Sequence, residues 1–178
     1  APPAPAAGDG LLHPVDARDF TIRFGPAQVG PLALRQRGLA AMVNATAATT
    51  MAKAVLGDAF RAEVAEAALR AVTAPFGLGE VIDVEGHPLE LVLVKNPAGF
   101  TVALGTYGSE PVATMIAIND DYADGQDVSW LYDVSFASLR GQGVAMTTGV
   151  RAFDMALRLH YDDVAVQRIE TDLAVALD

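Results

Sequence analysis

The second half of the chain alternates short apolar runs with single helical segments, and this alternation constrains the fold more than any other feature. The spacing of apolar residues distinguishes the two kinds of element: a strand is a short apolar run, and a helix has apolar residues three or four positions apart. Strands are predicted at 89–94, 112–118, 129–134, 143–149 and 164–168, and helices at 97–106, 151–161 and 170–177. Strands separated by single helices form a mostly parallel sheet covered on both faces. The sequence therefore predicts an α/β fold with a Rossmann-like, mostly parallel sheet.

The first half has a different pattern. Residues 1–18 are expected to be a linker or a cut end, because the start APPAPAAGDG is rich in Pro, Ala and Gly and has no period. FTIRF (20–24) and PLAL (31–34) predict two short strands. The alanine-rich segment 39–56 predicts a helix, and its apolar positions recur so densely that burial on most sides is expected.

A second helix is predicted at 58–72, with Asp58 as its N-cap. Its apolar face is expected to hold Phe60, Val64, Ala67, Ala68 and Ala71. The glycine-containing segment FGLGE then predicts a boundary at about 74–80, followed by a hairpin that turns at 85–88. The expected parts are the linker, residues 19–76 and residues 77–178.

Composition excludes several function classes. The chain has 178 residues, a net charge of −10 and no cysteine. An acidic chain lacks the cationic surface that nucleic-acid binding needs, and a chain without cysteine has neither disulfides nor a thiol nucleophile of its own. No signal-peptide pattern and no run of about 18 apolar residues occurs. A soluble cytoplasmic location is therefore expected.

The acidic segment 119–136, NDDYADGQDVSWLYDVSF, is the main candidate site. A calcium loop beginning at Asp120 would place Tyr122 at position 3 and Leu131 at position 12, which disfavours calcium. A solvated turn suits Asp120, Asp121 and Asp124, and Asp133 stays undecided. Asp127 differs, because it would stand at the edge of the predicted strand 129–134, where its direction is fixed.

Three other features of the sequence could carry chemistry. Lys95 and Asn96 follow an apolar strand and precede a predicted helix, a common ligand position in α/β sheets, although Asn96 could be only a helix cap. GPAQVGP (25–31) has the glycine spacing of a phosphate loop but lacks its lysine. The histidines, His13, His87 and His160, are expected in a linker, a hairpin turn and a helix end. None is a convincing base for a triad within the chain.

The quoted acidic segment, together with KNPAGF (95–100) and TTGVRAFDMALRLHY (147–161), resembles the C-terminal domain of the MurT family. That family supplies the Mur-ligase-like subunit of lipid II isoglutaminyl synthase. RGLAAMVNATAATTMAKAV (37–55) is similar to the end of the Mur ligase central domain. The resemblance covers about residues 36–178, so 19–76 would be a largely helical remnant of the central domain and 77–178 the third domain.

The resemblance implies that ATP and Mg²⁺ activate the α-carboxylate of D-glutamate in lipid II, and that a GatD-type glutaminase supplies ammonia. Asp127 would complete the glutaminase's Cys–His pair, and Asn44, Lys95 and Asn96 match positions near the nucleotide or substrate cleft. The family's phosphate loop and zinc ribbon are absent, and Gly77-Leu78 stands where related ligases carry Gly-Arg. Alone, the chain is expected to be inactive. Two alternatives remain: a non-enzymatic α/β interaction module of Mur ligase fold, and a nucleotide or amino-acid binder at Lys95-Asn96.

Overall fold

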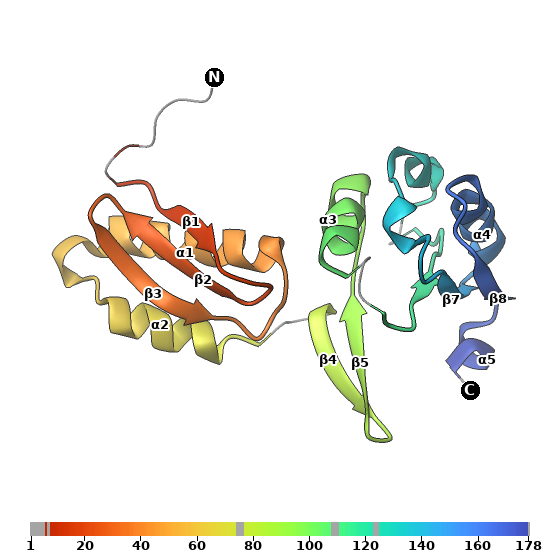
Figure 1. Ribbon diagram of the computed structural model, residues 1–178, viewed down its shortest axis with the longest axis horizontal. Coiled ribbons are helices and arrows are strands. Elements are labelled where there is room, and N and C mark those ends of the chain that lie inside the picture. The colour runs from red at the N-terminus through yellow and green to blue at the C-terminus, as the bar shows by residue number, and fades with distance from the viewer. Residues whose placement is uncertain (1–5, 7, 74–76, 108–110, 123–124, 178) are drawn as a thin grey trace. The chain divides into compact units, whose positions relative to one another are not determined.

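The computed structural model describes residues 6, 8–73, 77–107, 111–122 and 125–177 (Figure 1). The chain divides into two compact units, Ala1–Leu93 and Val94–Asp178. The predicted boundary at about 74–80 includes residues 74–76, which lie outside the described part of the chain. The domain limits proposed from the sequence stay a prediction.

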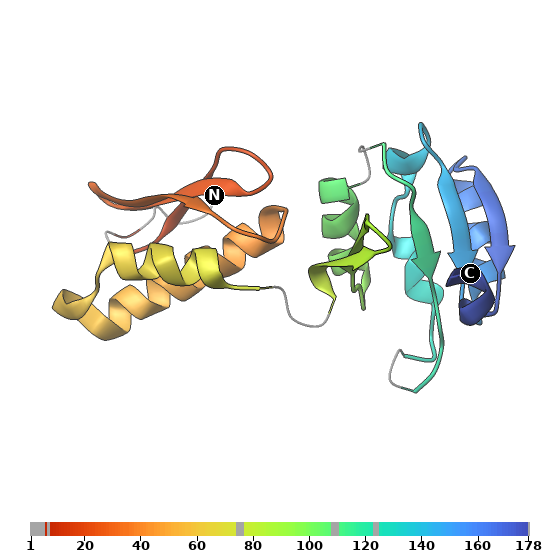
Figure 2. The same ribbon diagram turned by 90° about the horizontal axis from the view of Figure 1, so that it is seen from below.

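The first unit contains an antiparallel sheet with two helices on one face (Figure 2). Its strands are β1 (Leu11–Pro14), β2 (Asp19–Phe24) and β3 (Ala27–Ala33), and its helices are α1 (Leu39–Leu56) and α2 (Ala62–Ala71). Side chains alternate along β2, so Phe20, Ile22 and Phe24 all point into the core. The two predicted strands are confirmed. β1 was not predicted, and His13 lies in it rather than in a linker.

Two predictions about the first unit's helices are wrong. The residues of α1 that are buried are Met42, Ala45, Thr46 and Thr49, so one side packs on the sheet while Met51 and Val55 are exposed. Alanine density marked the helix but did not indicate how many sides are covered. The second helix begins at Ala62, after a 3-10 turn η1 (Gly57–Ala59), and Asp58 makes no cap hydrogen bond to it.

The predicted apolar face of the second helix is also wrong. Val64 is exposed, whereas Ala62 and Leu69 pack against the sheet core, together with Phe60 from before the helix. The segment Leu39–Ala59 is long and apolar enough to span a membrane by length and composition alone, which is weak evidence because a core helix passes the same test.

Residues 78–92 form the predicted hairpin. Strands β4 (Leu78–Val84) and β5 (His87–Val92) pair antiparallel around Glu85-Gly86, and both turn residues have positive φ, as a type I′ turn requires. Within the described residues this sheet has only these two strands. The prediction that 89–94 opens the parallel sheet is therefore wrong.

The second unit contains the predicted parallel sheet, with strand order β6 (Met115–Ala117), β7 (Val144–Thr148) and β8 (Val166–Glu170). Helices α3 (Pro97–Tyr107), α4 (Ala152–Tyr161) and α5 (Leu173–Leu177) follow the predicted order. The connection from β6 to β7 carries two 3-10 helices, η2 (Ser129–Asp133) and η3 (Ala137–Leu139). The prediction of a strand at 129–134 is wrong.

Candidate functional site

The acidic segment leaves the sheet at the carboxyl end of β6, beside the carboxyl end of β7. Arg151 donates its backbone N–H to the Ile118 carbonyl at 3.0 Å, and Val150 donates its own to Asn119 Oδ1 at 3.1 Å. Gly149 has a φ of 86°, and an added Cβ would overlap the Ile118 carbonyl oxygen. These contacts hold the two strand ends together at the edge where open α/β sheets bind ligands.

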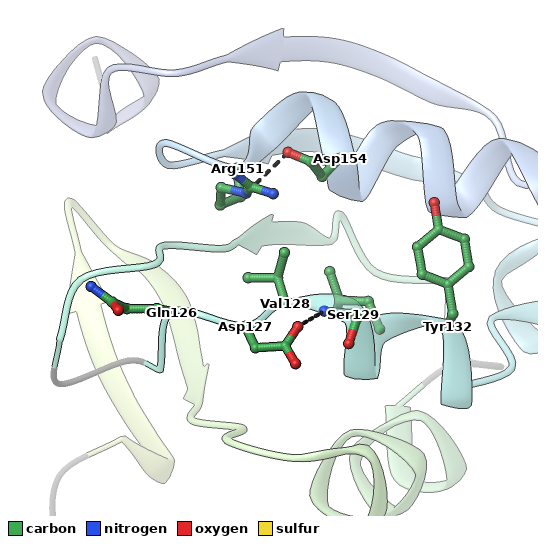
Figure 3. Close-up of a pocket in the computed structure, with 8 residues that line it drawn as sticks. Gln126, Asp127, Val128, Ser129, Tyr132, Arg151 and Asp154 are labelled. Carbon is green, nitrogen blue, oxygen red and sulfur yellow. Dashed lines mark hydrogen bonds and ion pairs between the residues drawn. The ribbon is translucent and has the colours of Figure 1, made fainter.

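A small open pocket of about 290 Å³ lies at this edge (Figure 3). It is lined by residues from the acidic segment and from the start of α4, namely Gln126, Asp127, Val128, Ser129, Leu131, Tyr132, Arg151 and Asp154. Of the sequence-predicted site residues, only Asp127 lines it. None of the three histidines does.

Asp127 is exposed and anchored by its neighbour. Ser129 donates its backbone N–H to Asp127 Oδ1 at 2.8 Å, which fixes the carboxylate ahead of η2. Hydrogen bonds from the Ser129 side chain and then from its backbone lower the pKa of Asp127 below its usual value. The second carboxylate oxygen points away from this hydrogen bond (Figure 3). Asp127 is therefore an oriented anion with one oxygen open to a further donor, and it precedes a 3-10 helix rather than a strand.

Arg151 is the cation of the pocket, and two acids already compensate its charge. Its guanidinium lies 3.4 Å from Asp120 Oδ2 and 3.1 Å from Asp154 Oδ2. Arg151 Nε forms an ion pair with Asp154, but the two groups do not have the geometry of a hydrogen bond. Asp120 is thus ion-paired rather than part of a solvated turn, whereas Asp121 is exposed as expected. Asp124 lies outside the described residues.

The sequence reading missed a buried arginine that holds η2 in place. Arg158 of α4 donates to the carbonyls of Leu131 and Val134, at 3.0 and 2.5 Å. It also pairs with Asp162 at 3.0 Å, and Asp162 in turn accepts the backbone N–H of Phe136. The Arg158 hydrogen bond is the main cause that lowers the pKa of Asp162. The sequence carries one sign of this role: Arg158 is a charged residue on a side of the helix whose other residues are buried.

The two motifs that carry the family resemblance meet in one aromatic cluster. Phe100 of α3 packs edge-on against Phe136, with ring centroids 5.1 Å apart, and lies 6.2 Å from Trp130. Trp130 is half-buried and packs against the core of the second unit. Its ring therefore does not turn the Asp127 carboxylate inward, and the acid stays accessible from outside.

Lys95 and Asn96 lie at the start of α3. Asn96 Oδ1 accepts the Gly99 backbone N–H at 2.8 Å, so Asn96 is the N-cap of that helix. Lys95 is exposed. Asn44 is exposed on α1, which belongs to the first unit.

These residues do not make a nucleotide or metal site on their own. The cap hydrogen bond occupies the Asn96 oxygen, and the chain has no phosphate loop to accompany Lys95. Within the described residues, no group of three or more His, Cys, Asp or Glu side chains could hold a metal ion. The donor set present here thus does not fit ATP with Mg²⁺, nor zinc.

Two solved structures share the fold. A pseudomurein peptide ligase type C from Methanothermus fervidus has a TM-score of 0.63 over 90% of this chain and 30% of that chain, at 15% identity. A Mycobacterium tuberculosis folylpolyglutamate synthase, complexed with ADP and AMPPCP, has a TM-score of 0.63 over 94% of this chain and 39% of that chain, at 20% identity. At these identities the likeness concerns the fold alone, which is of the Mur ligase and folylpolyglutamate synthase type.

Sequence comparison is more specific. Residues 93–178 match the MurT ligase C-terminal family. A stretch of 78 residues is 40% identical to the MurT subunit of lipid II isoglutaminyl synthase (glutamine-hydrolyzing) from Staphylococcus aureus strain COL, covering 42% of this chain and 18% of that protein. The Streptococcus pneumoniae R6 subunit of the same name is 28% identical over 159 residues, which cover 87% of this chain and 32% of that protein.

Residues 93–178 are therefore a MurT ligase C-terminal domain. The chain spans 18% and 32% of the lengths of these two relatives.

Proposed function

We propose that this chain is the C-terminal part of the Mur-ligase-like subunit of a glutamine-hydrolysing lipid II isoglutaminyl synthase, acting in peptidoglycan synthesis. The relatives in Staphylococcus aureus and Streptococcus pneumoniae carry that name, and the word subunit in it implies a second chain. In this proposal the second chain is a GatD-type glutaminase in the cytoplasm. The product is lipid II whose D-glutamate α-carboxylate has been amidated to D-isoglutamine.

The observation that carries the proposal is the state of Asp127. The carboxylate is exposed, held in one orientation by Ser129, and no described Lys or Arg forms an ion pair with it. Asp127 leaves one oxygen open at a pocket that contains no histidine. This arrangement suits an acid that receives a hydrogen bond from another protein.

We assign Asp127 the role of orienting the glutaminase's imidazole. Its open oxygen would accept the imidazole Nδ1–H, which fixes the tautomer and stabilises the imidazolium while the partner's Cys thiolate attacks the glutamine amide carbon. The imidazolium then gives its proton to the departing ammonia. A lowered pKa suits this role, because an orienting carboxylate must not itself take the proton. The absence of cysteine from the chain agrees with a nucleophile supplied in trans.

The ATP-dependent activation of the glutamate carboxylate belongs to the proposal for the whole enzyme. The described residues of this chain do not make up a nucleotide site, so the chemistry assigned to this domain is that of Asp127. For the same reason the chain by itself is proposed to be inactive.

The test uses the full-length subunit in complex with its glutaminase, and follows glutamate release from glutamine. Asp127→Asn should lower turnover by up to about 10⁴-fold, the loss seen when the acid of a Ser-His-Asp triad becomes an amide, with the complex still formed. Asp121→Asn is the matched control, because Asp121 is an exposed acid of the same segment outside the pocket. It should leave turnover unchanged. Turnover within about threefold of wild type for Asp127→Asn would sink the proposal.

The same experiment separates the alternative of a non-enzymatic interaction module. Such a module would form the complex but would not contribute an acid to the reaction. Complex formation together with equal glutamate release for wild type and Asp127→Asn is the result expected of the module.

A further inference from the structure

Arg151 connects the two elements that form the Asp127 pocket. It precedes α4, and the Ile118 carbonyl at the end of β6 accepts its backbone N–H. Its guanidinium lies 3.4 Å from Asp120, in the acidic segment, and 3.1 Å from Asp154, in the first turn of α4 (Figure 3). The two acids are 34% and 49% exposed, so the guanidinium is held between two carboxylates that other molecules could also reach.

Without Arg151, Asp154 would be a second open carboxylate in the pocket. It lines the same pocket as Asp127, and half of its side chain is accessible. Among the described residues, no Lys or Arg forms an ion pair with Asp127. Of the two described acids that line the pocket, Arg151 therefore compensates one and leaves the other open.

Two open carboxylates in one pocket would compete for a single donor. Every ionised carboxylate accepts hydrogen bonds, so an imidazole N–H has no chemical reason to choose between two aspartates. A neighbouring negative charge also raises the pKa of a carboxylate. An ion pair to Asp154 removes both effects without removing the acid. The pair depends on charge more than on the shape of the guanidinium, because Arg151 Nε forms no hydrogen bond.

We propose that Arg151 is a positioning residue for glutamine hydrolysis: it occupies Asp154 and Asp120, so that the glutaminase's imidazole meets Asp127 as the one open carboxylate of the pocket. This inference rests on the proposed function. Arg151 acts through the acids that it pairs with, not on the reacting atoms. A purely structural role is the alternative, because the same ion pairs join the acidic segment to α4. The two roles differ in what happens when Asp154 is removed together with the arginine.

The test measures kcat and KM for glutamine hydrolysis by the full-length subunit in complex with its glutaminase. Arg151→Met should lower kcat by about tenfold, a typical size for coupling between neighbouring charges, and leave KM unchanged, because glutamine binds in the partner. Arg151→Lys keeps a point charge and should stay within about threefold of wild type. Arg168→Met is the matched control, because it removes the same charge from a surface pair on β8. It should behave like wild type.

The deciding variant is Arg151→Met/Asp154→Asn, which removes the competing charge together with the arginine. If Arg151 acts by occupying Asp154, kcat should return to within about threefold of wild type. Asp120 then stays uncompensated, but it does not line the pocket. If Arg151 only joins the acidic segment to α4, the double variant should be as slow as Arg151→Met or slower. That result overturns the proposal, and so does a wild-type kcat for Arg151→Met.

These outcomes are separable from those for Asp127. Normal turnover of Asp127→Asn removes the triad and this inference together. An inactive Asp127→Asn, combined with no rescue of Arg151→Met by Asp154→Asn, removes this inference alone. Loss of the complex in Arg151→Met has the same meaning if the second substitution does not restore it.

Discussion

Replacing Arg158 tests how the domain holds the segment that carries Asp127. The Arg158 side chain is 8% exposed and donates to two carbonyls on either side of η2, while it pairs with Asp162, which is 19% exposed. Arg158→Met keeps most of the side-chain length but removes every donor. It leaves the Asp162 carboxylate without its main partner and two carbonyl groups without a donor.

The size of the effect follows from this geometry. Removing one partner of a buried ion pair typically costs about 3–5 kcal/mol, because the remaining charge is left uncompensated. The lost carbonyl hydrogen bonds belong to the same network, so they are not added separately. We therefore expect Arg158→Met to lower the free energy of unfolding of the second unit by about 3–5 kcal/mol.

The assay is urea unfolding followed by the fluorescence of Trp130. Trp130 is the only tryptophan of the chain and packs against the core of the second unit, so it reports on that unit. Arg168→Met is the matched control, because Arg168 is half-exposed and its pair with Glu170 lies at the surface. The control should lose less than about 1 kcal/mol. An equal, small loss for both variants would refute the reasoning that Arg158 holds η2.

The same network predicts a pH dependence. The pKa of Asp162 is lowered in the folded state, chiefly by the Arg158 hydrogen bond. A depressed folded pKa contributes stability above the unfolded value of about 3.9, and that stability is lost as pH falls through the folded pKa. Below about pH 4, the urea midpoint of wild type should therefore fall more steeply than that of Arg158→Met. Parallel curves would show that the pair is not the source of the acid sensitivity.

Two other substitutions test local geometry by the same assay. Gly149→Ala forces a Cβ into the Ile118 carbonyl at a φ of 86°, and should lower the free energy of unfolding by roughly 2–5 kcal/mol through backbone strain and overlap. The control is Gly141→Ala, whose Cβ meets nothing within 4 Å, and its free energy of unfolding should stay within about 0.5 kcal/mol of wild type. Similar losses for both variants would contradict the overlap. Asn96→Ala removes the cap hydrogen bond to Gly99 and should cost about 1 kcal/mol, and an unchanged midpoint would mean that α3 does not depend on its cap.

The alternation of short apolar runs with helical segments predicted the regular parts of the second unit. It located the runs that form β6, β7 and β8 and the helices α3 and α4. The segment 129–134 has the composition of a strand, yet it forms a 3-10 helix. Arg158 donates hydrogen bonds to the carbonyls of Leu131 and Val134. In a strand, these carbonyls would accept hydrogen bonds from a neighbouring strand. Arg158 is 24 to 27 residues away in the sequence, so no local pattern could show it.

The candidate site was predictable only in its chemistry. The sequence identified Asp127 and its need for a partner, but neither the hydrogen bond from Ser129 nor the neighbourhood of Arg151 and Asp154 followed from spacing. Those neighbours come from the next element of the sheet, across the β6–β7 pairing.

The central claim is that Asp127 acts on the glutaminase's active site from outside that protein. The most direct measurement is the rate at which iodoacetamide alkylates the glutaminase's nucleophilic cysteine at neutral pH, since the thiolate is the reactive form and a stabilised imidazolium favours it. Bound wild-type subunit should raise that rate over the glutaminase alone, and bound Asp127→Asn should not. Equal alkylation rates with wild type and Asp127→Asn, both at saturation, would contradict the claim.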